Sequence, residues 1–533
     1  MTVHHRPKPF VMLILDGYGI SFIQEGNAIA AAKKPVMDRL MKEYPVAAVR
    51  AGGEDVGLPW GEMGNSETGH QNIGSGRVLY QFLPRINKAL EDKSFFKNEA
   101  LVKAINHVKK NKNAALHTMG MLSNGGVHSH INHQFALLQA AADTGIGDRT
   151  FVHIFLDGRD SSPDDAGSFV KQLQEEIDKT GAGKIATLTG RYYAMDRAGN
   201  WDVTKVAYDM LTKGEGTQFA TWEEAVKSVF KKDDKKALEN AAPMIIADES
   251  SPMRTVQDGD AVIFYNYRSD RARQLTAPFV DPHFKEFEVT KFKDLVFATM
   301  ASYDENLKAD ILFPDEAIEH PLGEIFADHK LTQLRIAESE KFAHVTYFFN
   351  GGREKPYDGE TDVKIPSENT KDFSKNPAMK AKEITDRVLK EIENDAYDVI
   401  VMNYANADMV GHTGKFDPTV QAIEYLDEQV GRVVDAVLAK DGAVLLTCDH
   451  GKAEVVINHM THEPSTDHTN NPVPLMYISN QTKQDPAKDA AALQQILATP
   501  IGFLADVAPT ALDILGLPKP KEMTAQSLLS SLS

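Results

Sequence analysis

Cysteine is nearly absent from this sequence. The only one is Cys448, so the chain cannot form an internal disulfide. Proteins of reducing compartments rarely rely on disulfides, and we therefore expect a cytoplasmic protein. Cys448 ends the apolar run AVLLTC, and we expect it to be a small buried residue, neither a ligand nor a nucleophile.

Long hydrophobic runs are also missing. The N-terminal run FVMLIL has six apolar residues before Asp16. A signal-peptide core needs ~7–15 apolar residues and a membrane-spanning helix needs ~20, so we expect no secretory signal and no membrane partner.

Positive charge is scarce relative to negative charge. The chain has 58 Lys and Arg against 76 Asp and Glu, and its formal net charge is −18. Nucleic acids and anionic membranes select basic surfaces, so we expect no nucleic-acid partner. A small anionic substrate would need a local positive pocket built against this overall charge.

What the sequence does contain is a series of short apolar runs, each of which ends in a polar cluster. Continuous apolar runs are typical of strands buried on both faces of a parallel sheet. The runs are FVMLIL (10–15), FVHIFL (151–156), KIATLT (184–189), AVIFYNY (261–267), HVTYFF (344–349), DVIVMNYAN (398–406) and AVLLTC (443–448).

Helical patterns lie between these runs, for example over 164–180 and 418–440. Alternating strands and helices predict an α/β fold, and 533 residues are more than one core normally serves, so we expect two α/β domains. In such sheets ligands bind beyond the carboxyl ends of the strands, where the polar clusters fall.

Carboxylates and imidazoles gather in these clusters. Mixed Asp and His ligands without thiolate suit Mn²⁺, Mg²⁺ or Zn²⁺, and there are enough of them for a two-metal site. An Asp after a strand is also a common helix N-cap, but the joint pattern favours metal binding. The candidates are Asp16, Asp408 with His412, Asp449 with His450, and His468; we expect His459 and His462 to be surface residues.

The stretch GEMGNSETGHQNIGSGR, residues 61–77, has five glycines and no apolar run. This composition predicts neither a buried strand nor an amphipathic helix but a flexible loop. Ser66 lies in its middle. A serine hydroxyl becomes a good nucleophile when a metal ion lowers its pKa, and such a loop could carry Ser66 to the metal site.

The motifs, taken together, resemble the cofactor-independent phosphoglycerate mutase family, within the alkaline phosphatase superfamily. The resemblance covers about residues 10–515. The matching motifs, in chain order, are DGYG, MGNSETGHQNIGSGR, DGRDSSP, GRYYAMDR, NYRSDRARQ, HVTYFFNGG, NYANADMVGHTG, DHG and HTNNPVP.

The resemblance implies an isomerase that interconverts 3-phosphoglycerate and 2-phosphoglycerate without bisphosphoglycerate, with Ser66 as the acceptor of the phosphoryl group. It implies two divalent metal ions, usually Mn²⁺, with Mg²⁺, Co²⁺ or Zn²⁺ as substitutes. The implied ligands are Asp16, Ser66, Asp449 and His450 for one ion, and Asp408, His412 and His468 for the other.

Arginines follow the strand ends in the middle of the chain. The planar guanidinium binds phosphate and carboxylate through paired hydrogen bonds, whereas an isolated arginine is usually a solvated surface residue. Their grouping favours an anion pocket. The resemblance assigns substrate binding to Arg159, Asp160, Arg191, Arg197, Arg268 and Arg271, with His128 and Lys341 beside the phosphoryl site.

Within this set we expect Asp160 to orient or deprotonate a glycerate hydroxyl and Lys341 to neutralise the transferring phosphoryl charge. We expect His130, His133 and Arg273 to be structural.

The metal candidates come from both ends of the chain and the arginines from its middle, which predicts an inserted domain. We expect an alkaline-phosphatase-like metal domain at 1–82 and 308–533, a substrate-binding phosphotransferase domain at 83–307, and a monomer.

The chain departs from the family pattern at Lys452, Glu454 and Cys448, which leaves pocket polarity and metal preference open. The alternatives are a phosphopentomutase or metal phosphohydrolase of the same superfamily, a non-catalytic phosphate or metal sensor, and a regulatory protein that uses only the fold.

Overall fold

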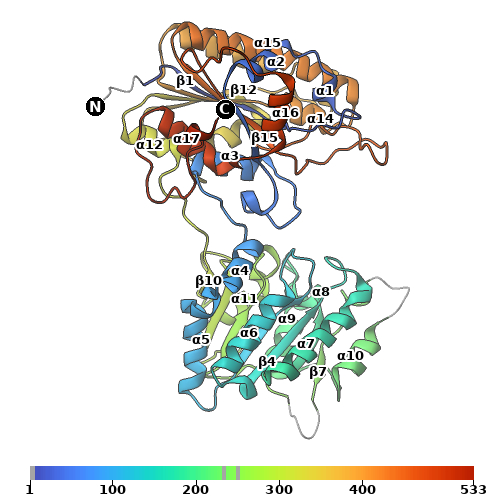
Figure 1. Ribbon diagram of the computed structural model, residues 1–533. Coiled ribbons are helices and arrows are strands. Elements are labelled where there is room, and N and C mark those ends of the chain that lie inside the picture. Colours follow the sequence, from blue (N-terminus) through green and yellow to red (C-terminus); the bar gives the residue numbers. More distant parts are fainter. Residues whose placement is uncertain (1–5, 231–235, 248–252, 533) are drawn as a thin grey trace. The chain divides into compact units, whose positions relative to one another are not determined.

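The computed structural model describes residues 6–230, 236–247 and 253–532 (Figure 1). The chain divides into two compact units, residues 1–81 with 317–533, and residues 82–316. Each unit is a sheet of mainly parallel strands with helices against it, which confirms the predicted α/β class. Within the described ranges no helix has both the length and the apolar character needed to cross a bilayer.

The first unit contains an eight-stranded sheet. β1, the run predicted from FVMLIL, lies near its centre, and all six of its side chains are buried, as expected for a strand covered on both faces. The strand order is β12 (Glu360–Ile365), β11 (Gln333–Glu338), β13 (Val399–Tyr404), β1 (Phe10–Leu15), β14 (Ala443–Thr447), β15 (Val473–Ser479), β2 (Val46–Arg50) and β16 (Gly502–Phe503).

The four neighbours β11, β13, β1 and β14 run parallel. Phe10 of β1 is in register with Val399 and Ala443, so the carboxyl ends of these strands meet at one edge. Helices α2 (Pro35–Glu43), α14 (Asn406–Gly411) and α15 (Phe416–Ala439) lie on one face, and α3 (Ser66–Ser75), α12 (Leu322–Asp328) and α17 (Val507–Ile514) on the other (Figure 1). The carboxyl ends of these four strands lie side by side, and residues that follow them can form a common site.

The second unit repeats this arrangement. Phe155 of its strand β4 belongs to one buried hydrophobic cluster and Ile154 to another, so its sheet too is covered on both faces. The order is β10 (Asp310–Phe313), β9 (Val296–Ala301), β8 (Ala261–Phe264), β3 (Leu116–Leu122), β4 (Thr150–Leu156), β5 (Lys184–Gly190), β7 (Met244–Ile246) and β6 (Thr217–Phe219). Strands β8, β3, β4 and β5 are parallel neighbours.

Both long helices predicted from the sequence form: the pattern at 164–180 contains α7 (Ala166–Thr180), and the pattern at 418–440 lies largely within α15.

Two local predictions are wrong. HVTYFF is not a strand but a single π-helical turn, His344–Phe348, in which Val345 and Phe349 are buried four residues apart. The strand in this region is β11, which ends shortly before, and the β-branched and aromatic residues after it pack with helical spacing.

The glycine-rich stretch at 61–77 is not a loop throughout, since it contains α3. Asn65 caps this helix by accepting a hydrogen bond from the Thr68 N–H, and Gly76 ends it in the left-handed conformation. The helix is buried on nearly every face because its small residues allow close contact: a Cβ at Gly69 would lie 2.6 Å from the Asp449 carbonyl oxygen. The apolar stripe that usually identifies a helix is therefore missing.

Candidate active site

The predicted metal ligands of the first unit meet at the carboxyl edge of its sheet. Asp16 follows β1, and Asp449 and His450 follow β14. Asp408 lies in α14, the short helix after β13, and His412 caps the end of that helix. Asp16, Asp449 and His450 are fully buried, so these charged groups must be compensated by other charges or ligands.

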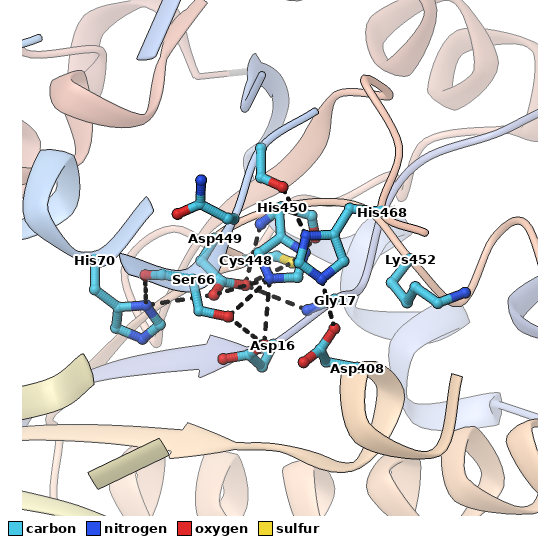
Figure 2. Close-up of polar contacts among 12 residues, drawn as sticks. Asp16, Gly17, Ser66, His70, Asp408, Cys448, Asp449, His450, Lys452 and His468 are labelled. Carbon is cyan, nitrogen blue, oxygen red and sulfur yellow. Dashed lines mark hydrogen bonds and ion pairs between the residues drawn. The ribbon is translucent and has the colours of Figure 1, made fainter. Parts of the chain in front are cut away.

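Ser66 is the first residue of α3, and its side chain points into this cluster (Figure 2). Its hydroxyl oxygen Oγ lies 2.9 Å from His450 Nε2 and donates to Asp16 Oδ1 over 3.3 Å. The same His450 nitrogen is 3.5 Å from both Asp16 Oδ1 and Asp449 Oδ2. We call Asp16, Ser66, Asp449 and His450 the Ser66-side set.

The second group, Asp408, His412 and His468, is the His412-side set. Each imidazole donates from Nδ1 to a carbonyl oxygen, His412 to Thr466 and His468 to Gly64, both over 2.7 Å. A carbonyl oxygen can only accept, so in the neutral imidazoles both Nε2 atoms carry lone pairs. These two nitrogens lie 2.9 Å apart, at 3.1 and 3.3 Å from Asp408 Oδ1.

When both imidazoles are neutral, the three groups face one another with their lone pairs, an arrangement that fits a bound cation. The backbone bonds at Nδ1 are the outer contacts that usually fix the tautomer of a metal-binding histidine. Nitrogen and oxygen ligands without thiolate suit a divalent ion such as Mn²⁺, Mg²⁺ or Zn²⁺. The residues present therefore fit a metal centre.

Lys341 lies at the centre of the site, after β11. Its Nζ atom donates to Asp16 Oδ1 and Asp408 Oδ2 over 2.7 Å and to Ser66 Oγ over 2.6 Å. Burial alone would lower the pKa of Lys341, but Asp16 and Asp408 raise it above its usual range. Lys341 is therefore a fixed positive charge beside Ser66. It contacts one carboxylate of the Ser66-side set, Asp16, and the carboxylate of the His412-side set, Asp408.

A cavity of about 410 Å³ opens over these residues. It is lined by Asn65, Ser66, Glu67, Thr68, Gln81, Lys341, His344, Asp408, Met409, His412 and His468.

Two residues of this site were missed. His70 lies one helical turn after Ser66, and Asn403 lies in β13 beside Asp16; both side chains are fully buried. His70 stands in the same motif as Ser66, so helical spacing of four could have revealed it. Asn403 gave no comparable signal within the apolar run DVIVMNYAN.

In the second unit the predicted substrate residues follow four neighbouring parallel strands. Arg268 and Arg271 come after β8, His128 after β3, Arg159 and Asp160 after β4, and Arg191 and Arg197 after β5.

Asp160 and Asp270 are the anionic partners in this cluster. Arg191 donates to Asp160 Oδ1 over 2.8 Å, and Arg197 and Arg268 donate to Asp270 over 2.6 and 3.1 Å. His128 lies 3.9 Å from a carboxylate oxygen of each Asp, and burial lowers its pKa to about 4, so it is neutral at pH 7.

The arginines outnumber their carboxylate partners. Burial and the nearby charges of Arg191 and Arg197 lower the pKa of Arg271, whose guanidinium donates to the Met195 carbonyl over 3.1 Å. Arg159 is exposed. A substrate anion would relieve this repulsion between like charges.

Asp157 organises this cluster and was not predicted. Its Oδ1 accepts from the backbone N–H groups of residues 158–160 over 2.7, 2.9 and 3.0 Å, and from Arg191 over 3.2 Å. Ser123 and Ser161 donate to its Oδ2 over 2.6 and 2.7 Å. The carboxylate therefore fixes the loop that carries Arg159 and Asp160.

His459 and His462 are exposed, as expected, and Cys448 is a buried free thiol. Lys452 is buried and donates to the Ser465 carbonyl over 3.1 Å, and its amino group points away from the Ser66-side set in Figure 2. Glu454 accepts from the Gly19 N–H over 3.1 Å.

Comparison with known proteins gives consistent matches along the whole chain. Residues 8–519 match the Metalloenzyme superfamily. The 2,3-bisphosphoglycerate-independent phosphoglycerate mutases of Clostridium perfringens (strain SM101 / Type A) and Clostridium acetobutylicum are each 46% identical, over 98% of this chain and 99% of their own length. A Leishmania mexicana phosphoglycerate mutase, solved at low cobalt concentration, is 29% identical with a TM-score of 0.54, over 99% of this chain and 98% of that one.

Proposed function

This chain belongs to the 2,3-bisphosphoglycerate-independent phosphoglycerate mutase family and interconverts 3-phosphoglycerate and 2-phosphoglycerate, and we propose that it does so by passing the phosphoryl group through Ser66. One observation carries the proposal. Ser66 starts a helix, and its hydroxyl lies within 3.3 Å of Asp16, His450 and Lys341.

This position suits both the nucleophile and the phosphoserine that it would become. The N-terminus of a helix attracts anions through its free N–H groups and its dipole. Lys341 adds a full positive charge 2.6 Å from the oxygen that would bear the phosphoryl group. The chain thus offers compensation for the charge that develops during transfer.

We propose two divalent metal ions, one held by the Ser66-side set and one by the His412-side set. Manganese is the first candidate, with magnesium, cobalt or zinc as alternatives, because the donors are nitrogen and oxygen only. When bound, such ions would lower the pKa of the Ser66 hydroxyl and stabilise the phosphoryl charge.

The arginines of the second unit would bind the glycerate part of the substrate. A phosphoglycerate carries a carboxylate and hydroxyls, which paired guanidinium hydrogen bonds can hold. Asp160 keeps one unpartnered buried oxygen, Oδ2, and that atom would accept the proton of a glycerate hydroxyl. His128, neutral and 3.9 Å from the same oxygen, would position it.

The reaction then has two symmetric steps. Ser66 Oγ loses its proton and forms a bond to phosphorus as the bond from phosphorus to the substrate oxygen breaks, and the departing oxygen takes up a proton to become a hydroxyl, so that no net proton is gained or lost. The arginines keep the glycerate bound while its other hydroxyl turns toward the phosphoserine. That hydroxyl loses its proton to Asp160 and forms a bond to phosphorus as the bond from phosphorus to Ser66 Oγ breaks, and Oγ takes up a proton. Water must be excluded in the meantime, or the phosphoserine is hydrolysed.

Labelling tests the role of Ser66. The protein, loaded with Mn²⁺ and given 3-phosphoglycerate labelled in its phosphoryl group, should yield a quenched peptide with labelled phosphoserine at Ser66. Ser66→Ala should keep its fold and lose isomerisation. Ser75→Ala is the matched control, since it removes a buried hydroxyl from the other end of the same helix. Comparable turnover in Ser66→Ala, with no label on the wild-type peptide, would refute the proposal.

We further propose that the first unit is the metal-binding domain that carries Ser66 and that the second is the substrate-binding phosphotransferase domain. The distribution of the two residue groups between the units supports this division. We also propose a cytoplasmic monomer; the buried free thiol of Cys448 agrees with a reducing compartment.

A further inference from the structure

His70 and Asn403 link the two carboxylates of the Ser66-side set through a buried chain of polar contacts. Asn403 Nδ2 donates to Asp16 Oδ2 over 2.8 Å and lies 3.1 Å from His70 Nε2. His70 Nδ1 lies 2.8 Å from the Ser66 carbonyl oxygen and 3.3 Å from Asp449 Oδ2 (Figure 2). Three of the four ligands of this set are thus contacted by two side chains that are themselves fully buried.

The protons of this chain can be assigned from the contacts. The Ser66 carbonyl oxygen can only accept, so His70 Nδ1 carries a hydrogen. His70 Nε2 then has a lone pair and accepts from Asn403, whose amide has a second N–H for Asp16. In this state the one hydrogen of His70 Nδ1 is donated to the Ser66 carbonyl oxygen, and the 3.3 Å approach to Asp449 Oδ2 is an electrostatic contact. Because Nδ1 then has no lone pair and Nε2 accepts from Asn403, we do not expect His70 to be a ligand.

The backbone of α3 next to His70 packs closely against Asp449. A Cβ at Gly69 would lie 2.8 Å from Asp449 Cβ, so α3 passes as near to Asp449 as its backbone allows. His70 comes from α3 and Asn403 from β13, so their contact joins the helix that carries Ser66 to the strand beside Asp16.

We propose that His70 and Asn403 are positioning residues that hold Asp16, Asp449 and the Ser66 backbone in the orientation that binds the metal ion of the Ser66-side set. This inference rests on the proposed two-metal function. Lys341 compensates the charge of Asp16 through Oδ1, and Asn403 fixes the direction of the carboxylate by donating to its other oxygen, Oδ2. Outer contacts that orient ligands typically change metal affinity by roughly 10–100-fold.

Mn²⁺ titration of metal-free protein, with bound ions counted by elemental analysis, tests the proposal independently of activity. Wild-type protein should bind two ions per chain. His70→Ala should keep one ion at wild-type affinity and bind the other roughly 10–100-fold more weakly. His70→Asn, whose amide nitrogen can take the place of Nδ1, should recover most of the loss, whereas His70→Gln should not.

Two further variants separate positioning from general stability. Asn403→Ala should weaken the same ion, and His70→Ala combined with Asn403→Ala should weaken it little further, because one chain of contacts is already broken. Asn72→Ala is the control: Asn72 is buried in the same helix and donates to the Val56 and Thr68 carbonyls. It should lower thermal stability and leave both affinities unchanged.

The outcomes are distinct. A wild-type protein that binds fewer than two ions refutes the two-metal proposal itself. Two ions in wild type and unchanged affinities in His70→Ala and Asn403→Ala refute the positioning role alone, even where their melting temperatures fall. If His70→Ala does not fold, the comparison of His70→Asn with His70→Gln and the titration of Asn403→Ala decide.

Discussion

The Nζ atom of Lys341 lies 2.6 Å from Oγ of Ser66. The same ammonium contacts Asp16 and Asp408, so one lysine compensates carboxylates of both proposed ligand sets and faces the proposed nucleophile. Lys341→Met keeps the approximate length of the side chain and removes its charge. We expect isomerisation to fall by roughly 10²–10³-fold, the range found when one electrostatic contact to a transition state is removed.

The same variant should reveal how the buried carboxylates are compensated. Without metal, Lys341 is the cation nearest to Asp16 and Asp408, so Lys341→Met removes most of the positive charge beside these buried carboxylates and should be strongly destabilising. Added Mn²⁺ should therefore raise the melting temperature more in Lys341→Met than in wild type. Equal shifts in a thermal denaturation series would contradict this account.

Arg268 should matter for the substrate and not for the metals. Its guanidinium contacts Asp270 in the second unit and is half exposed, which leaves it able to bind an anion. Arg268→Ala should lose most isomerase activity while Mn²⁺ affinity is retained. Arg273→Ala is the matched control, because Arg273 is an exposed arginine five residues further along the chain. Wild-type turnover in Arg268→Ala would show that Arg268 is a solvated surface residue and does not bind the substrate.

Metal binding should release protons and strengthen as pH rises. Burial alone would lower the pKa of His450, but Asp449 and Asp16 raise it to about 9 in the metal-free protein. His450 therefore carries a proton at pH 7, and a metal ion must displace it. Mn²⁺ affinity should increase from pH 6 to pH 9, and calorimetry in buffers of different ionisation enthalpy should show proton release. A flat pH dependence would argue against His450 as a ligand.

The second unit should lose stability in acid. Burial lowers the pKa of His133 to about 3 and holds that of His153 well below its usual range. Both groups gain protons on unfolding below their unfolded pKa of ~6.5, so stability is complete above this pH and falls as pH drops toward the folded values, by ~1.4 kcal/mol per unit of pKa difference and per group.

Hydrogen exchange at pH 7.5 and pH 5.0 measures this effect. Amides of β3 and β4 should lose protection at the lower pH, and His133→Gln should reduce the pH dependence while lowering stability at pH 7.5, since Nε2 of His133 lies 3.1 Å from Asn87 Oδ1. Unchanged protection of these strands between the two pH values would disprove the prediction.

Much of the architecture could be predicted because the signals are local. A strand such as Phe10–Leu15, buried on both faces, needs a continuous apolar run, and its polar successor Asp16 must come at the strand end. The same rule located Asp449 and the arginines after β4, β5 and β8. Residue type and position along the chain were sufficient for these assignments.

Other features depend on contacts that no local pattern contains. The helix that begins at Ser66 has no apolar stripe because it packs through small residues against segments far away in the chain, such as Asp449. HVTYFF has strand-like composition, yet the packing around Val345 and Phe349 decides that it turns as a helix.

The sequence by itself determined the fold class, the family resemblance and which side chains could act as ligands, because these follow from residue types in a given order. Only the tertiary structure brought Asn403 and His70 between Asp16 and Asp449, and Asp157 beneath the loop of Arg159. Hydrogen bonds between such residues depend on the register of parallel strands and on how closely a helix approaches them. That geometry is created by the packing of the whole unit and has no signature at any single position.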